Sequence, residues 1–479
     1  MISSVAHCTL NLSLEEILAF ILHLPSSSYP CLLDSCNYQN YELYTGRYLI
    51  AAYQPENCLQ VTDNTSYLLS RQQEKVVNGN VMAFLDEVLD EWRVSLQEQL
   101  PADFPCSNGA AIGVFSYDLG RYFERIPKIA KSNHFAPDLF LCFYTVLIVY
   151  DYFHDKATLI ACSQKPNQAD SRLKAALSQL ERMGKSAPKL SLSNKGRKYQ
   201  YKSTFTKEAY LSTVEKIKAY IKVGDIYQAN LTQQFQFNLL GLDASEIFLK
   251  IRTQFPVPFA AYFKTPNWSV VSASPECFLE CQGRDVAAYP IKGTRARGVD
   301  TKSDNQLANE LINSEKDRAE NIMIVDLLRN DLGRVSEIGS IDASRILSLQ
   351  ALPTVFHLTS KVSGKLREDI KLSDLLKATF PCGSITGAPK LRAMEILEEI
   401  EPTRRGLSMG SIGWLGYNGD LGLNVAIRTL FIQNEQGYFN VGGGVTADSD
   451  PLAEYEESLV KAQAMFQAIG LEIIGNNKV

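Results

Sequence analysis

Residues 290–297 read P-I-K-G-T-R-A-R, and residues 314–331, after a polar span, read S-E-K-D-R-A-E-N-I-M-I-V-D-L-L-R-N-D. The first of these segments places Lys292 between an expected strand at 286–291 and the flexible Gly293. A lysine fixed at such a position can lose its hydration and act as an amine nucleophile or as a base. A solvated lysine is the alternative that this stretch alone leaves open.

The second segment predicts a helix with an acid on its inner face. Ser314 is a preferred residue type at a helix N-cap, and Ile324, Leu327 and Leu328 recur after it at helical spacing. Glu320 precedes them on the same face and is expected to point inward. A buried carboxylate is costly unless it meets a cation, so either a metal ion or a buried lysine or arginine should lie opposite.

The composition is that of an ordinary globular protein and argues against several functional classes. The length of 479 residues allows about three domains, or fewer if two share one core. A net charge of −5 gives no general attraction to nucleic acid. Ten cysteines are scattered singly, as in proteins of a reducing compartment. The start of the chain lacks a signal-peptide pattern and the apolar run at 17–24 is too short to span a bilayer, so we expect a cytoplasmic protein with no membrane partner.

The chain divides into two β-rich regions on either side of a turn-rich stretch. Residues 1–165 alternate short β-like runs with turns, residues 166–204 contain one short helix and few apolar residues and are interpreted as a linker, and residues 205–475 form the second region. The expected elements are a helix at 81–96, a hairpin of 139–152 with 157–162, a helix at 207–223, strands at 226–237, 260–263 and 270–279, a helix at 372–379 and a last helix that begins at 450–451.

Two segments of the second region could hold an anion or a cation. Residues 383–390 read G-S-I-T-G-A-P-K, in which small residues with free backbone N–H groups lead into a helix, an arrangement that can bind a carboxylate or phosphate. A helix cap without a ligand is the alternative. In the last helix Glu454, Glu457 and Lys461 share one face, so two inward acids would need a cation. An exposed charged stripe is the alternative there.

Three further positions are candidates for substrate contacts or catalysis. Residues 441–445 read V-G-G-G-V, which favours the close approach of a ligand or of another strand. Arg428 lies in an apolar alternating run and could bind a carboxylate bidentately or pair with a buried acid. Glu276 follows a proline and would be a general acid if burial raised its pKa, although acids in surface turns are commoner.

Taken together and in this order, the motifs resemble those of the chorismate-utilising enzymes. The resemblance covers roughly residues 205 to 470, and G-V-F-S-Y-D-L-G-R-Y-F-E-R-I-P (113–127) and L-L-D-S (32–35) extend it to nearly the whole chain. The motifs that carry it are S-P-E, P-I-K-G-T, K-D-R-A-E-N-x-M-I-V-D-L-L-R-N-D, G-S-I-T-G-A-P-K, I-R-T-L, G-G-G and E-Y-E-E-S.

Two positions separate branches of this family. Anthranilate synthases usually have alanine where this chain has Lys292, and the lysine form is typical of the aminodeoxychorismate synthases. Isochorismate and salicylate synthases have a water-activating lysine where this chain has Gln228. The resemblance therefore implies amination of chorismate at carbon 4, on the route to 4-aminobenzoate and folate.

The resemblance also implies a fold and a set of site residues. The expected fold is α/β (α+β), with two stacked, mainly antiparallel β-sheets in a sandwich surrounded by helices. Mg²⁺ is expected between carboxylates of two helices, with Glu320 and Glu457 as ligands and Glu454 acting through water. Lys292 is the expected nucleophile, Glu276 the acid, and His357 lies near the substrate ring. The expected substrate contacts are Thr386, Gly387, Arg428, Gly443, Gly444 and Lys461. One departure is Ser408, which stands where the family usually has a tyrosine.

A partner is implied as well, because these synthases receive ammonia from a glutamine amidotransferase subunit. The alternatives are anthranilate synthase component I and a non-catalytic subunit that only docks an amidotransferase. The four residues Glu276, Lys292, Glu320 and Glu457 are all intact, which argues against a non-catalytic role.

The N-terminal region raises the question of a second ligand. In these families the L-L-x-S segment lines a tryptophan pocket between two sheets, and Leu33, Asp34 and Ser35 match it here, with aspartate in place of the more usual glutamate. A pocket filled by local side chains is the alternative. Our hypothesis is that any tryptophan bound here is structural and does not inhibit.

Overall fold

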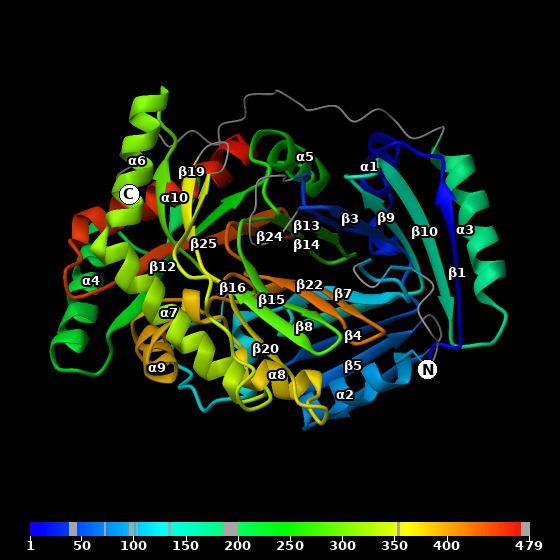
Figure 1. Ribbon diagram of the computed structural model, residues 1–479, viewed down its shortest axis with the longest axis horizontal. Coiled ribbons are helices and arrows are strands. Elements are labelled where there is room, and N and C mark those ends of the chain that lie inside the picture. Colours follow the sequence, from blue (N-terminus) through cyan, green and yellow to red (C-terminus); the bar gives the residue numbers. More distant parts are fainter. Residues whose placement is uncertain are drawn as a thin grey trace.

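Two large β-sheets stack face to face in the computed structural model, and helices cover their outer sides (Figure 1). The structure describes residues 1–37, 46–70, 73–94, 100–101, 104–132, 136–184, 200–351 and 355–470. Neighbouring strands run antiparallel in both sheets. The predicted sandwich of antiparallel sheets surrounded by helices is confirmed.

The first sheet has twelve strands and joins the two ends of the chain. Strand β2 of the N-terminal region pairs with β13 of the second region, in the register Leu33 to Ala261. The path runs β1 (Ser4–Leu10), β10 (Lys156–Ser163), β9 (Val146–Asp151), β3 (Tyr48–Ala52), β2 (Cys31–Asp34), β13 (Phe259–Lys264), β14 (Ser269–Ser274), β24 (Thr429–Gln433), β25 (Gln436–Val445), β12 (Gln228–Asn238) and β11 (Tyr201–Ser203), with β21 (Gly387–Ala388) also paired to β12.

The second sheet has ten strands and also combines both regions. Strand β7 of the N-terminal region pairs with β22 of the second, in the register Gly113 to Gly413. The path runs β20 (Val362–Lys365), β16 (Asp285–Tyr289), β15 (Cys277–Gln282), β23 (Leu421–Asn424), β22 (Ser411–Gly416), β7 (Ala110–Phe115), β8 (Leu139–Tyr144), β4 (Asn57–Thr62), β5 (Thr65–Ser70) and β6 (Glu74–Asn78).

A third, three-stranded sheet was not expected from the sequence. It consists of β17 (Ile291–Ala296), β19 (Val355–Thr359) and β18 (Ser348–Ala351), in that order. Its strands carry Lys292 and His357, so this small sheet presents two of the predicted catalytic residues.

The helices complete the hydrophobic cores. On the outer side of the twelve-stranded sheet lie α1 (Leu14–Leu22), α3 (Ala169–Gly184), α5 (Ala244–Gln254) and α10 (Pro451–Ile469). Below the ten-stranded sheet lie α2 (Val81–Trp92), α7 (Glu315–Gly333) and α8 (Leu372–Thr379). The remaining helices, α4 (Lys207–Lys222), α6 (Thr301–Asn313) and α9 (Lys390–Ile400), stand at the end that holds the candidate site (Figure 1).

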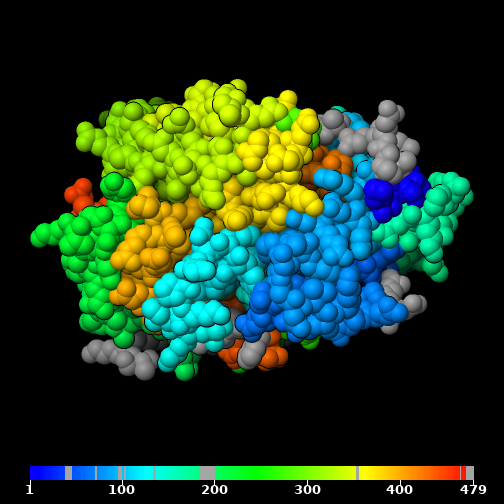
Figure 2. Space-filling view, turned by 90° about the horizontal axis from the view of Figure 1, so that it is seen from below, coloured from blue at the N-terminus to red at the C-terminus, as the bar shows by residue number. Residues whose placement is uncertain are grey.

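The inner core between the two sheets is aromatic. The ring of Trp268 lies 5.2 Å from that of Phe140 and 5.6 Å from that of Phe431, centroid to centroid. On the underside, the segment 117–130 lies between α9 and α2, as Figure 2 shows in cyan between orange and blue. Arg121 of this segment donates to Glu398 of α9 at 2.5 Å, which ties the N-terminal region to the second region.

Three apolar runs that the sequence presents as single strands are each divided between two sheets. The run at 139–152 breaks at Thr145 into β8 and β9, so only β9 and β10 form the predicted hairpin. The run at 270–279 breaks at Pro275, and the run at 286–291 breaks at Pro290. Proline lacks the N–H needed to continue a ladder, which explains the breaks at Pro275 and Pro290. Both large sheets are buried, so the polarity does not change where the chain crosses between them at Thr145 and Pro275.

Other predicted elements agree closely with the structure. The helices at 207–223 and 372–379 and the strand at 226–237 appear as α4, α8 and β12. The helix predicted at 81–96 ends at Trp92, and residues 95 and 96 lie outside the described residues. Within 166–204 the structure describes α3, whereas 185–199 lie outside the described residues, as do 471–475. None of the described helices combines the length and the apolar character needed to cross a membrane.

Candidate active site

Lys292 is held by a local irregularity of the three-stranded sheet. The register of β17 against β19 shifts between Lys292 and Thr294, and Gly293 has a φ of +78°. A side chain at Gly293 would be strained and would meet Leu311 at 2.8 Å, so glycine is required there. Lys292 Nζ donates to the backbone oxygen of Ser384 at 3.1 Å. The lysine lies within β17, rather than after the end of the preceding strand as the sequence suggested.

Glu276 occupies the crossing between β14 and β15 and is almost completely buried. Its backbone oxygen accepts from Val425 N at 3.0 Å, which fixes the turn. Burial raises the pKa of Glu276 to about 7, while the nearby Ser384 hydroxyl and the Lys292 ammonium oppose that rise. Its Oε1 atom has no hydrogen-bond partner among the residues that the structure describes. The group can therefore hold a proton near neutral pH and present it to a ligand.

Two helices direct two carboxylates toward this lysine. Glu320 on α7 accepts from Gln228 Nε2 at 3.5 Å, and burial raises its pKa although Lys292 and Lys316 lower it. Burial would also raise the pKa of Glu457 on α10, but Lys461, Lys316 and Lys292 outweigh burial and lower it. The two acids thus share the field of the same lysines.

The third carboxylate, Glu454, is buried one turn earlier on α10. It accepts from Ser449 Oγ at 2.6 Å and forms an ion pair with Lys316 at 3.6 Å. The inward orientation predicted for Glu320 and Glu454 agrees with the structure. The inward orientation predicted for Glu457 is wrong, because this side chain is half exposed and forms an ion pair with Lys461 at 2.6 Å at the edge of the helix face.

Gly443 of β25 lies directly beneath these α10 side chains. A Cβ at this position would lie 3.0 Å from Glu454 Oε2, 3.6 Å from Glu457 Oε1 and 3.7 Å from Lys461 Nζ. Lys461 Nζ donates to the backbone oxygen of Gly442 at 3.0 Å. The glycine run therefore allows α10 to pack close to β25. The charged ends of Glu454, Glu457 and Lys461 occupy the space that a side chain at position 443 would fill.

The residues present can be compared with a divalent metal site. Glu320, Glu454 and Glu457 supply hard oxygen donors, which is the ligand type that Mg²⁺ prefers. Among the described residues, however, no three His, Cys, Asp or Glu side chains are close enough to hold an ion as they stand. Lys461 and Lys316 face the carboxylates. The donor chemistry fits Mg²⁺, and binding would require the ion to replace Lys461 as the partner of Glu457.

His357 and Arg428 form a second part of the site. Burial, with a smaller contribution from the charge of Arg428, lowers the pKa of His357 to about 3, so the imidazole is neutral. Its Nδ1 atom lies 2.9 Å from Thr294 Oγ1. Arg428 was expected on a strand, but it precedes β24 with a φ of +48°. The chain crosses there from the ten-stranded to the twelve-stranded sheet, which interrupts the alternation.

The predicted anion-binding segment forms a buried turn rather than an open loop. Thr386 Oγ1 donates to the backbone oxygen of Gly383 at 3.2 Å, and Asn230 N donates to Thr386 O at 2.8 Å. A Cβ at Gly387 would lie 2.2 Å from Gln228 O. The turn is thus packed against β12 beside Gln228, whose Nε2 also covers Gly444, where a Cβ would meet it at 1.8 Å.

A buried ion pair behind this turn was missed by the sequence reasoning. Arg405 donates to both oxygens of Glu401 and to the backbone oxygens of Ile385 and Asn230. Burial would lower the pKa of Arg405, but Glu401 raises it above its usual range. Arg405 follows Arg404 in the segment after α9, outside any helix or strand. No helical or alternating pattern therefore indicated that its side chain is buried. Ser384, whose backbone oxygen accepts from Lys292, belongs to the G-S-I-T-G-A-P-K segment, but nothing in the sequence indicated this contact.

Ser408, where the resemblance predicts a tyrosine, is buried. Its Oγ accepts from Asn440 N at 3.3 Å. Here the residue supports the backbone of β25, one strand position before Val441 and the glycine run.

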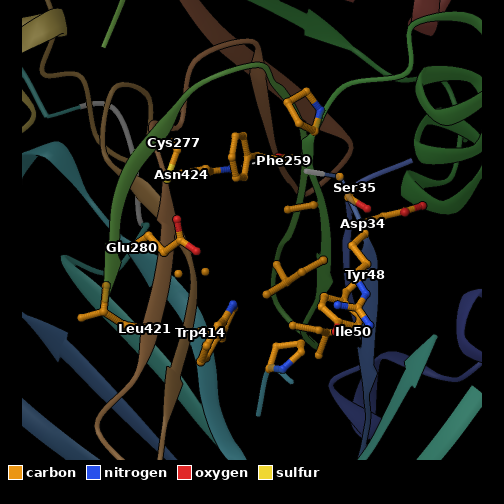
Figure 3. A pocket seen from close by; sticks show the side chains of 18 of the residues that line it. Asp34, Ser35, Tyr48, Ile50, Phe259, Cys277, Glu280, Trp414, Leu421 and Asn424 are labelled. Carbon is orange, nitrogen blue, oxygen red and sulfur yellow. Dashed lines mark hydrogen bonds between the residues drawn. The ribbon is translucent and has the colours of Figure 1, made fainter. Parts of the chain in front are cut away.

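The residues of the predicted tryptophan pocket lie outside the candidate active site. They line a cavity of about 390 Å³ between the two sheets. Leu33, Asp34 and Ser35 all contribute to its wall. Figure 3 labels Asp34 and Ser35 at its edge. The Asp34 carboxylate, however, is turned away from the cavity, and it accepts hydrogen bonds from Arg252 Nε and Tyr152 Oη, each at 2.7 Å.

A different acid projects into this cavity. Glu280 enters from β15 and points toward the space above Trp414 (Figure 3). Its Oε2 atom accepts from Tyr289 Oη at 3.1 Å. Glu280 is exposed within the open cavity, whereas the residues before it in β15 are buried. Sequence reasoning missed its role, because a single exposed acid in a strand is common on any protein surface.

Comparison with known proteins decides the family. A family model described as chorismate binding enzyme matches residues 44–467. The chain belongs to this family. The resemblance inferred from the motifs is confirmed, and the members of the family are enzymes that act on chorismate.

Named relatives of the family cover almost the whole chain. Aminodeoxychorismate synthase component 1 of Bacillus subtilis (strain 168) is 37% identical over 429 residues, which cover 89% of this chain and 90% of the relative. The protein of the same name from Escherichia coli (strain K12) is 36% identical over 413 residues, covering 86% and 88%. The crystal structure of anthranilate synthase component I from Streptococcus pneumoniae TIGR4 matches with a TM-score of 0.77 at 29% identity, covering 88% of this chain and 92% of that one.

Proposed function

We propose that this chain is the chorismate-aminating component of an aminodeoxychorismate synthase and adds ammonia at carbon 4 of chorismate. The observation that carries the proposal is Lys292, because relatives that aminate at carbon 2 usually have alanine at this position. The contacts of Lys292 support the proposal, since Glu276, with a pKa raised to about 7, lies within its electrostatic reach. The names of the two relatives support it as well.

The first step is a displacement by the lysine amine. Lys292 first gives its ammonium proton to water. The resulting amine forms a bond from Nζ to ring carbon 2, the ring double bonds shift, and the bond from carbon 4 to its hydroxyl oxygen breaks. Glu276 gives its proton to that oxygen, which leaves as water. Covalent catalysis of this kind divides one difficult displacement into two easier ones.

The second step restores the lysine. Ammonia forms a bond to carbon 4, the double bonds shift back, and the bond from carbon 2 to Nζ breaks. The proton that the new ammonium group gives up returns to the Glu276 carboxylate. The enolpyruvyl group is retained throughout, so the product is 4-amino-4-deoxychorismate.

The remaining site residues bind and orient the substrate in this proposal. Glu320, Glu457 and Glu454 would hold Mg²⁺, which would supply positive charge for the ring carboxylate. Arg428, Lys461, Thr386, Gly387 and the Gly443 and Gly444 backbone contact the rest of the substrate. His357, neutral because its pKa is about 3, faces the ring without adding charge.

Ammonia requires a source. The relatives are named component 1, which implies a second component. We propose a glutamine amidotransferase subunit in that role, and the cytoplasm as the place of assembly, since all ten cysteines are free thiols.

Anthranilate synthase component I is the alternative function. It is favoured by the match to the Streptococcus pneumoniae structure, which carries that name. A non-catalytic docking subunit is disfavoured by the gathering of Lys292, Glu276, Glu320 and Glu457 around one site.

Product identification separates these functions. Purified chain, chorismate, Mg²⁺ and ammonium are incubated, and the products are identified by mass and fluorescence. Amination with retention of the enolpyruvyl group supports the proposal. Anthranilate with release of pyruvate would establish the alternative, and unchanged chorismate with and without an amidotransferase would indicate a docking subunit.

The cavity between the sheets is proposed as a structural site. An amino acid with an aromatic side chain suits its lining of Tyr48, Phe104 and Trp414. Because Asp34 is already paired with Arg252, the ammonium group of such a ligand would face Glu280 instead. In keeping with the 4-aminating function, a tryptophan bound there stabilises the sandwich and does not inhibit.

A further inference from the structure

A buried glutamine beside the candidate site has no internal partner for either end of its amide. Gln350 on β18 is 2% exposed. Neither its Oε1 nor its Nε2 atom has a hydrogen-bond partner among the residues that the structure describes. Buried side-chain amides are ordinarily bonded, because an unsatisfied donor or acceptor destabilises the fold. Gln350 therefore needs an explanation.

The register of the three-stranded sheet places this amide next to the histidine of the site. Gln350 pairs with His357 across β18 and β19, and His357 pairs with Thr294 across β19 and β17. Residues directly opposite in a sheet project to the same face, so all three side chains share one polar face. Arg428 is near enough to this face to lower the pKa of His357.

The other face of the same sheet is apolar and already covered. Phe356 and Leu358, which flank His357 in β19, pack against Leu311 of α6. The polar face is therefore the one opposite α6, and Arg428 lies on its side of the sheet, close enough to act on His357.

Another buried glutamine provides a contrast. Gln233 on β12 is 1% exposed, donates from Nε2 to Ser458 Oγ at 2.6 Å and accepts from Ser203 Oγ at 2.7 Å. The fold thus satisfies a buried amide where the amide is structural. Gln350 differs from Gln233 because no described residue forms a hydrogen bond with either polar atom of its amide.

We propose that Gln350 is a substrate-binding residue whose amide completes its hydrogen bonds only when chorismate is bound beside His357. The inference rests on the proposed function, because it takes chorismate as the ligand. Chorismate offers a hydroxyl group, an ether oxygen and carboxylate oxygens, and a neutral amide can donate to one such oxygen and accept from the hydroxyl. The amide does so without adding charge next to Arg428.

The test is Gln350→Met, which keeps the volume of the side chain and removes both polar atoms. Without substrate, the variant should melt about 2 °C or more above the wild type, because two unsatisfied polar atoms are gone. With chorismate and ammonium, its kcat/KM should fall roughly tenfold, since a hydrogen bond to substrate is lost. The rise in Tm that chorismate alone produces should also shrink. This combination of a more stable and less active protein is not expected of a merely structural residue.

Gln233→Met is the matched control. It removes two hydrogen bonds that the free protein makes, so its Tm should fall. The proposal is overturned if Gln350→Met lowers Tm as the control does, or if it leaves kcat/KM and the chorismate-induced Tm rise unchanged. The proposed function is judged separately, from the product that the wild-type chain makes.

Discussion

Replacing Glu276 by glutamine tests the proposed acid through stability and activity together. The folded-state pKa of Glu276 is about 7, against an ordinary value of 4.5, and burial is the main cause. Between these two pH values the folded protein holds a proton that the unfolded chain has lost. Stability therefore falls as pH rises through this window and levels off above it. Glutamine, which is neutral throughout, removes this dependence.

The magnitude follows from the size of the shift. A difference of about 2.5 pKa units corresponds to about 3 kcal/mol of unfolding free energy, most of which is lost between pH 5 and pH 8. Unfolding entropy scales with length, so for a chain of 479 residues this is about 2 to 3 °C in Tm. We expect Glu276→Gln to melt close to the wild type at pH 5 and about 2 to 3 °C above it at pH 8.

The activity of the same proteins gives the second readout. With the concentration of free NH3 held constant, wild-type kcat/KM should fall above about pH 7, because the acid form of Glu276 is lost there. Glu276→Gln should have little activity at any pH. Glu181→Gln, which removes an exposed acid of α3, serves as the control and should follow the wild type in both assays. A Tm difference between Glu276→Gln and the wild type that does not widen with pH would refute the reasoning.

Three other predictions concern the metal, the lysine and the inter-sheet cavity. Glu320→Gln and Glu457→Gln should each abolish turnover at ordinary Mg²⁺ concentration, because each removes a charge from a divalent site; full turnover in either variant contradicts the metal assignment. Lys292→Ala should lose most amination at carbon 4 and form some anthranilate, and undiminished product by mass would rule out the covalent route. Tryptophan added to the ammonia-dependent assay should leave the rate unchanged, whereas inhibition at micromolar levels would indicate an anthranilate synthase.

The sequence predicted the kinds of element well but not the places where the chain changes sheet. α8 and β12 were located almost to the residue, because their helical and alternating patterns are strong. The pattern predicts single strands across Thr145, Pro275 and Pro290, whereas the structure divides each run in two. Both large sheets are covered by helices, so the residues on either side of Thr145 and Pro275 are equally apolar, and the hydrophobic pattern cannot mark these breaks. After Pro290 the chain enters the small sheet, where β17 is polar after Ile291.

The places where the chain passes between sheets also limited the prediction of site residues from the sequence. Glu276 lies at one crossing and Arg428 at another, which is why the buried acid resembled a surface turn and the arginine resembled a strand residue. Spacing along helices did predict the inward orientation of Glu320 and Glu454. The partners Ser384 and Lys316 come from other elements, so only the folded chain reveals them.

The most direct test of the covalent account is to look for chorismate bound to the protein. Wild-type chain is incubated with chorismate and Mg²⁺ without ammonia or glutamine, quenched, digested and analysed by mass spectrometry. The account predicts a peptide containing Lys292 that is heavier by the mass of chorismate less one water, and the loss of this species when ammonium is added before the quench. Formation of 4-amino-4-deoxychorismate by a protein that never carries this adduct, or that carries it on another residue, would contradict the account.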